Sequence, residues 1–116
     1  MVIVRTGRCT IRPEAMDACK AFMRETVAYT KENEPGTLMY MVVQEAENPT
    51  SFVIIQAYSD EAALERHLTA EPMLTNIREV LVPAMIDGPH FTHYTIVEAK
   101  IPSSLAQTDR QEGHSL

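Results

Sequence analysis

The sequence predicts an α+β domain whose elements follow the order β-α-β-β-α-β. Four short segments are rich in β-branched and aromatic residues, and two stretches between them repeat apolar residues every three or four positions. A chain of 116 residues is long enough for one domain with its own hydrophobic core. We expect residues 1–101 to form this domain and the polar residues 102–116 to form a flexible tail.

The first strand and the first helix are expected within residues 1–33. Residues 1–11 begin with a β-branched run that is typical of a strand. Pro13 and Glu14 suit the first turn of a helix, because proline lacks an N–H and a carboxylate favours the positive helix end. Apolar residues then follow at helical spacing until the sequence "NEPG", which predicts a helix end near Asn33.

A strand hairpin and a short helix are expected next. Residues 37–45 and 52–58 read as strands, and the turn-rich sequence "AENPTS" between them predicts an antiparallel hairpin. Ser59 or Asp60 can cap the helix that follows. Pro72 predicts a break after this helix.

A further helix is expected over residues 73–85, ended by the sequence "DGP" at 87–89, with a last strand over 90–99. This order matches a ferredoxin-like fold, in which helices cover one face of a four-stranded antiparallel sheet. The strands at 37–45 and 52–58 are apolar at nearly every position, so both sheet faces should be buried. A second copy of the sheet is the simplest cover, which predicts a homodimer.

Charge and cysteine content narrow the function classes. The net charge is −6 and no cluster of Lys or Arg is present, so neither a nucleic acid nor an anionic membrane is an expected partner. No apolar run approaches the length of a membrane span, and residues 1–12 are too short and too charged for a signal peptide. Cys9 and Cys19 have no metal-binding spacing and suit two reduced thiols, so we expect a cytoplasmic protein.

Residues 34–73 resemble the antibiotic biosynthesis monooxygenase family of the dimeric α+β barrel group. The shared features are a Glu-x-Gly turn, an "NP" hairpin, an aromatic residue at a strand end and a helix of the form D-x-x-A-L-x-x-H. In this sequence they are Glu34-Pro35-Gly36, Asn48-Pro49, Tyr58, and Asp60 through His67. The first helix and the last strand match the family in layout only.

The resemblance implies a ferredoxin-like fold whose two copies close a β-barrel, with a ligand cavity in each subunit. Family members include monooxygenases that act on aromatic polyketides without metal or flavin, haem-degrading enzymes and an isomerase, so the fold alone does not fix the reaction. The strand-end aromatic is Tyr58 where the family commonly has Trp, and Pro72 stands where a second His is frequent. Haem degradation is set aside, because residues 1–12 contain no Asn and the axial position falls near Ile77.

The expected function is oxidation of a phenol, hydroquinone or polyketide-like aromatic by O2, with neither metal nor cofactor. No redox-cofactor motif is present, so the substrate must supply the electrons once it is deprotonated. His67 is the expected general base, and its place beside Ala63 and Leu64 predicts a ring that borders a cavity. The alternative is a core-edge histidine bonded to a carbonyl. A non-redox isomerase or a small-molecule-binding dimer is the alternative function.

Further site residues are expected around His67. Tyr58 is assigned a catalytic role as a hydroxyl donor, and Tyr40 a substrate contact, although both could simply pack the barrel. His93 is expected at the cavity mouth, and Met73 as part of an adaptable lining. His90 and His93 should face opposite ways on a strand, so no metal site is expected there.

Overall fold

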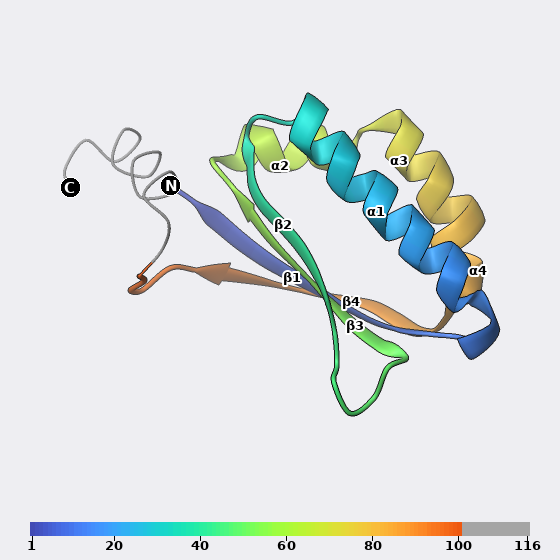
Figure 1. Cartoon of the computed structure of the whole chain (residues 1–116). Coiled ribbons are helices and arrows are strands. Elements are labelled where there is room, and N and C mark those ends of the chain that lie inside the picture. Colours follow the sequence, from blue (N-terminus) through green and yellow to red (C-terminus); the bar gives the residue numbers. More distant parts are fainter. Residues whose placement is uncertain (101–116) are drawn as a thin grey trace.

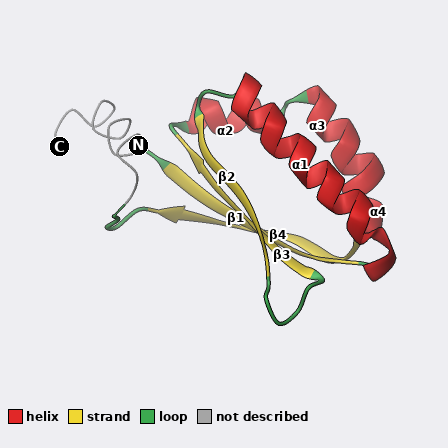
Figure 2. Ribbon diagram, viewed as in Figure 1, coloured by secondary structure: helices red, strands yellow, loops and turns green. Residues whose placement is uncertain are grey.

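The computed structural model describes residues 1–100, and the tail expected at 102–116 lies outside the described residues. A four-stranded antiparallel sheet carries helices on one face (Figures 1 and 2). The strands are β1 (Ile3–Ile11), β2 (Thr37–Gln44), β3 (Ser51–Tyr58) and β4 (Met85–Thr95). The helical elements are η1 (Pro13–Ala15), α1 (Met16–Asn33), α2 (Glu61–Leu68), α3 (Glu71–Asn76), η2 (Ile77–Leu81) and α4 (Val82–Ala84).

The strand order β2-β3-β1-β4 confirms the ferredoxin-like prediction. β1 lies inside the sheet and pairs with β3 and β4, while β2 and β3 form the expected hairpin. The backbone N–H of Ser51 donates to the carbonyl of Asn48 at 2.9 Å, and the Asn48 amide donates to the Ser51 hydroxyl at 3.1 Å. These bonds close the turn around Pro49.

The main hydrophobic core lies between the sheet and the helical elements α1, η2 and α4 (Figure 1). Alternate residues of each strand point towards the helices, so one face of the sheet supplies half of this core. The main buried cluster consists of Cys9, Ile11, Cys19, Phe22, Met23, Phe52, Leu81 and Ala84. A smaller cluster joins Tyr58 of β3 to Ala63 and Leu64 of α2.

The expected boundary between the last helix and the last strand is wrong. The sequence predicts a helix through Met85 and a strand from His90, but β4 already begins at Met85. Met85 pairs with Ile11 of β1, and the Arg12 N–H donates to the carbonyl of Ala84 at 2.8 Å. Sheet pairing therefore keeps the chain extended from Met85 onwards.

The sequence "DGP" at 87–89 also lies within β4 and does not end a helix. Between the partners of Arg8 and Thr10, β4 contains one more residue than β1, which is a β-bulge. Gly88 has a φ of 102°, and a Cβ on it would lie 2.6 Å from the carbonyl oxygen of Arg8. Glycine is therefore required for this bulge.

The sheet face opposite the helices carries exposed apolar side chains. Met41 is 45%, Val43 36% and Tyr94 49% exposed, and no helix within residues 1–100 covers this face (Figure 1). The β2–β3 hairpin thus has apolar side chains on both faces, as the sequence indicates, but within residues 1–100 the chain buries only one of them.

Both cysteines are free and buried. Burial raises the pKa of the Cys9 thiol to about 11, and that of Cys19 is raised for the same reason. Both side chains are therefore protonated thiols near neutral pH. In residues 1–100, no helix combines the length and the hydrophobicity that crossing a lipid bilayer requires.

Candidate active site

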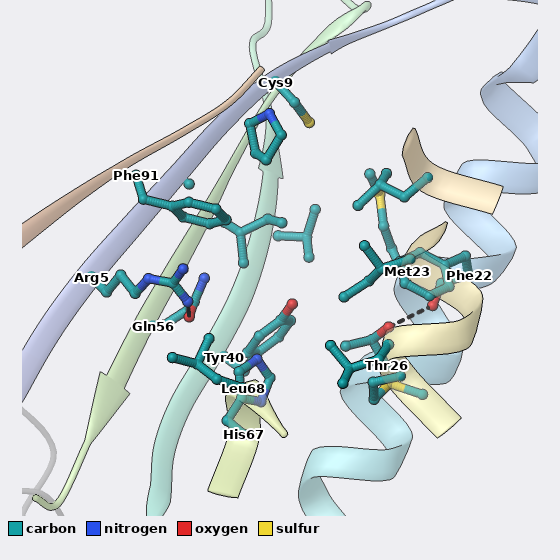
Figure 3. Close-up of a pocket in the computed structure, with 18 of the residues that line it drawn as sticks. Arg5, Cys9, Phe22, Met23, Thr26, Tyr40, Gln56, His67, Leu68 and Phe91 are labelled. Atoms are coloured by element: carbon teal, nitrogen blue, oxygen red, sulfur yellow. Dashed lines mark hydrogen bonds between the residues drawn. The ribbon is translucent and has the colours of Figure 1, made fainter. Parts of the chain in front are cut away.

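A cavity of about 240 Å³ lies between the sheet and the helices (Figure 3). The helices supply mainly apolar walls, for which Phe22, Met23, Ile77 and Leu81 are typical. The polar side chains on the sheet and on α2 are Arg5, Tyr40, Gln56 and His67. An apolar cavity with a few convergent polar groups is the usual form of a small-molecule site.

His67 reaches this cavity because of the way α2 is fixed. The Asp60 carboxylate accepts a hydrogen bond of 2.8 Å from the Ala63 N–H and caps the helix, as predicted. Ala63 and Leu64 then pack against Tyr58, which fixes the face that α2 presents to the sheet. His67 lies one turn after Ala63 on the same side, where its ring forms part of the cavity wall.

Glu34, directly after α1, holds the His67 ring. The His67 Nδ1 lies 2.8 Å from Glu34 Oε1, and the two side chains are only 11% and 7% exposed. The Thr37 hydroxyl donates to the same oxygen at 2.8 Å. Glu34 Oε2 is buried and has no hydrogen-bond partner within residues 1–100. The carboxylate therefore interacts mainly through Oε1.

This contact defines what His67 can do chemically. A carboxylate oxygen only accepts hydrogen bonds, so an ionised Glu34 requires the Nδ1 of His67 to carry the proton and donate. The other ring nitrogen, Nε2, then has a free lone pair and no partner within the described residues. A histidine held in one tautomer, with its free nitrogen at a cavity, is arranged as a general base.

Gly36 explains why Glu34 and His67 meet. A Cβ at Gly36 would lie 2.6 Å from the Cβ of Ala63, a distance that real side chains do not adopt. The turn after α1 can therefore approach α2 only with glycine at this position. The Ser59 N–H donates to the Gly36 carbonyl at 2.9 Å and fixes the approach.

Tyr40 stands beside the histidine on β2. Its ring centroid lies 5.4 Å from that of His67, and its hydroxyl points into the cavity (Figure 3). This hydroxyl makes no hydrogen bond within residues 1–100. Burial raises the pKa of Tyr40 to about 12, so the phenol stays protonated and can donate to a ligand.

Tyr58 lies behind the cavity wall and does not line it. It is fully buried, and its ring centroid is 5.5 Å from that of His67. Its hydroxyl donates to Gln56 Oε1 at 2.5 Å, and burial raises the pKa of the phenol. In the single chain Tyr58 therefore orients Gln56, which does line the cavity, and has no direct route to a ligand.

Arg5 extends from β1 into the same wall. Its guanidinium lies 3.8 Å from the centroid of the Phe91 ring, and its Nη1 donates to Gln56 Oε1 at 3.3 Å. Gly7 makes room for the stack, because a Cβ there would lie 2.8 Å from the Phe91 ring. The side chain is 8% exposed, and its Nε has no partner within residues 1–100.

Of the two other residues expected to contact the substrate, Met73 lines the cavity and His93 does not. Met73 is buried and lines the cavity. His93 is exposed and is not among the lining residues. His90 bonds instead to Asp87 at 3.0 Å on the surface. Within residues 1–100, no three His, Cys, Asp or Glu side chains gather closely enough to hold a metal ion.

Three polar residues of the site, Glu34, Arg5 and Gln56, have no role that the sequence alone predicts. Glu34 was visible only as part of the turn motif, since its partner lies far along the chain. Arg5 and Gln56 did give a signal, because each interrupts an apolar strand at a position whose parity matches buried neighbours. A polar residue on the buried face of a strand indicates that this part of the face borders a cavity.

Sequence comparison settles the family. The sequence model of the antibiotic biosynthesis monooxygenase (ABM) family matches residues 1–79. The chain belongs to this family. The matched part of the ABM chain contains Arg5, Glu34, Tyr40, Gln56 and His67.

Solved structures agree with the ABM fold. A Caulobacter crescentus protein, described as a candidate antibiotic biosynthesis monooxygenase, has a TM-score of 0.78 at 20% identity, over 84% of this chain and 91% of that chain. A similarly described protein of Bacteroides thetaiotaomicron has a TM-score of 0.76 at 26% identity, over 87% and 94% of the two chains. A Mycobacterium tuberculosis protein has a TM-score of 0.76 at 19% identity, over 85% of this chain and 98% of that chain. A search of curated proteins gives no match.

Proposed function

We propose that this ABM-family protein is a monooxygenase that oxidises an electron-rich phenol, hydroquinone or polyketide-like aromatic with O2. The observation that carries the proposal is the His67–Glu34 contact of 2.8 Å at the wall of a mainly apolar cavity. Such a pair can remove a phenolic proton in a place from which water is largely excluded.

The proposed reaction needs no external electron donor. His67 Nε2 accepts the phenolic proton, and the resulting phenolate reduces O2, which adds to a ring carbon as a peroxide. Cleavage of the O–O bond, with loss of the ring hydrogen at that carbon, leaves a quinone carbonyl and one water. One oxygen atom enters the product and the other leaves in water, so a phenol plus O2 gives a quinone plus water.

The neighbours of His67 have matching roles in this proposal. Glu34 acts as a positioning residue that stabilises the imidazolium formed by proton transfer. The Tyr40 hydroxyl points into the cavity and has no hydrogen bond within residues 1–100, so in this proposal it donates to the oxygen on which negative charge develops. Tyr58 positions Gln56 through the 2.5 Å hydrogen bond.

A non-redox isomerase is the second candidate, and one observation favours it. A base at His67 and a protonated donor at Tyr40 lie on the same cavity, with ring centroids 5.4 Å apart. This pair could move a proton between two positions of a carbonyl compound without O2.

An oxygen electrode distinguishes the two candidates. We expect O2 uptake when the protein is mixed with hydroxynaphthalenes, with one O2 consumed per quinone formed. Under nitrogen, product formation should stop. Conversion that continues unchanged under nitrogen would favour the isomerase and contradict the oxygenase.

We also propose that two copies of the chain pack through the helix-free sheet face. The exposed Met41, Val43 and Tyr94 on this face support the pairing, because contact with a second copy would remove their apolar surface from water. Sedimentation at micromolar concentration should give about twice 13.0 kDa. A monomer at that concentration would contradict this pairing. A cytoplasmic location, suggested by the free cysteines, is part of the same proposal.

A further inference from the structure

Arg5 is a buried cation without an anionic partner in the part of the chain that the structure describes. It is 8% exposed, and it makes no ion pair within residues 1–100. Among residues 1–100, none of those that line the cavity is Asp or Glu. The nearby Glu34 carboxylate is bonded to His67 and Thr37 through Oε1. A buried charge is costly unless an opposite charge or several hydrogen bonds compensate it.

The guanidinium is nonetheless held in a fixed orientation. Phe91 stacks on it at 3.8 Å, and Gln56, itself fixed by Tyr58, accepts one hydrogen bond of 3.3 Å. An arginine has five N–H donors, and within residues 1–100 those of Arg5 meet only Gln56 Oε1 and the Tyr58 hydroxyl, while Nε has no partner. The other donors are oriented in advance and remain available to a ligand in the cavity that Arg5 lines.

We propose that Arg5 binds an oxyanion carried by the substrate, so that the substrate class is a flat aromatic compound with a carboxylate or an ionised phenol or enol. The planar fork of a guanidinium matches two oxygens of such a group. The anion would supply the charge that the described chain does not place beside Arg5. This inference rests on the proposed function in one respect, which is that the bound oxyanion belongs to a substrate.

The size and lining of the cavity agree with this ligand class. An apolar cavity of about 150 Å³ holds a single benzene ring, so about 240 Å³ is suited to a two-ring aromatic. The helix side offers Phe22 and Met23 to the ring system (Figure 3), while the sheet side offers Arg5 to its charged group. A ligand with one apolar body and one oxyanion satisfies both walls.

Direct binding measurements test the inference without any turnover. We would titrate 2-naphthoate and its neutral analogue 2-naphthamide into the full-length protein at neutral pH under nitrogen, using calorimetry. The carboxylate should bind about tenfold or more tightly than the amide, since hydrogen bonds to charged groups are worth that much. In Arg5→Gln this preference should disappear.

Matched variants keep the test specific. Arg78→Gln removes the same charge from an exposed position and should keep the full preference for the carboxylate. Arg5→Lys retains the charge without the planar fork and should keep part of the preference. Thermal unfolding shows whether Arg5→Gln is folded. If it is not, Arg5→Lys replaces it in the test.

A further ligand separates the two sources of the oxyanion. A halogenated naphthol can be titrated below and above its own ionisation. Tight binding of 2-naphthoate assigns a carboxylate, and tight binding of the naphthol only in its ionised form assigns a phenolate; either result supports the inference.

Equal binding of charged and neutral ligands, or a preference that survives Arg5→Gln, would overturn the inference. Arg5-dependent binding without any O2 uptake would contradict the proposed function and leave the oxyanion site standing. O2 uptake that is equally fast in the wild-type protein and in Arg5→Gln would support the proposed function and contradict the oxyanion site at Arg5.

Discussion

The Nδ1 of His67 lies 2.8 Å from Oε1 of Glu34, although the two residues are 33 positions apart in the sequence. This contact joins the end of α1 to the last turn of α2. It leaves His67, at the edge of the core, with Nδ1 bonded and with no partner for Nε2 within residues 1–100. The chemical proposals for this chain depend on this contact.

Glu34→Gln should lower kcat by roughly 10- to 100-fold and leave KM nearly unchanged, because the amide can still hold the ring but cannot stabilise the imidazolium. Steady-state rates on an oxidisable naphthol measure both constants. Glu34→Asp, which keeps the charge, should recover part of kcat. A rise in KM with kcat unchanged would show that Glu34 acts on ligand binding and not through His67.

Gly36→Ala should reduce both stability and turnover, because its Cβ would lie 2.6 Å from that of Ala63 and push the Glu34 turn away from α2. Overpacking of this kind costs about 1–3 kcal/mol of unfolding free energy. Urea unfolding provides the measurement. The double variant Gly36→Ala with Ala63→Gly relieves the closest contact, so its loss should be smaller than the sum of the two single losses. Simple additivity would contradict the proposed contact.

Tyr40→Phe should reduce the fall in unfolding free energy that accompanies a rise in pH above 10. The pKa of Tyr40 is raised from 10.0 to about 12 in the folded chain. Above pH 10 the unfolded chain therefore binds fewer protons than the folded one, and the unfolding free energy falls as pH rises towards 12. Unfolding in urea at about pH 9 and about pH 11 tests this. The variant should lose less stability between these two values than the wild-type protein, and an equal loss would contradict the burial of this phenol.

Arg5→Met should raise the melting temperature of the ligand-free protein. The change removes a buried charge that has no ion pair within residues 1–100 and introduces an apolar side chain of similar length, so a gain of about 1 kcal/mol or more is expected. Differential scanning calorimetry measures it, with the exposed Arg78→Met as the control. A marked fall in melting temperature specific to Arg5→Met would mean that its contacts with Phe91 and Gln56 are chiefly structural.

Much of the fold follows from local patterns in the sequence. Two runs that are apolar at nearly every position, joined by a turn-rich sequence, predict the hairpin of β2 and β3, and Ser59 or Asp60 predicts the start of α2. The error at Met85 has a different origin. Its side chain fits a helical apolar pattern, but backbone pairing with Ile11, which is remote in sequence, keeps it extended.

The site was predictable only in part. His67 stands out because a titratable ring shares a helix face with Ala63 and Leu64. Its partner Glu34 becomes apparent only when the Gly36 turn is packed against α2. Tyr58 has the chemistry of a donor, but it is fully buried outside the cavity lining and its hydroxyl is bonded to Gln56 at 2.5 Å, and no local pattern contains that information.

The central claim is that His67 is the base for oxidation of the substrate by O2, and oxygen-isotope transfer tests it most directly. The wild-type protein, His67→Gln and, as a control, His93→Gln at an exposed histidine outside the cavity would each convert a naphthol under ¹⁸O2. The wild-type protein and the control should place one ¹⁸O atom in the quinone at equal rates, and His67→Gln should be slower by roughly 10²–10⁴-fold. Product oxygen that comes from water, or a His67→Gln variant as fast as the control, would contradict the account.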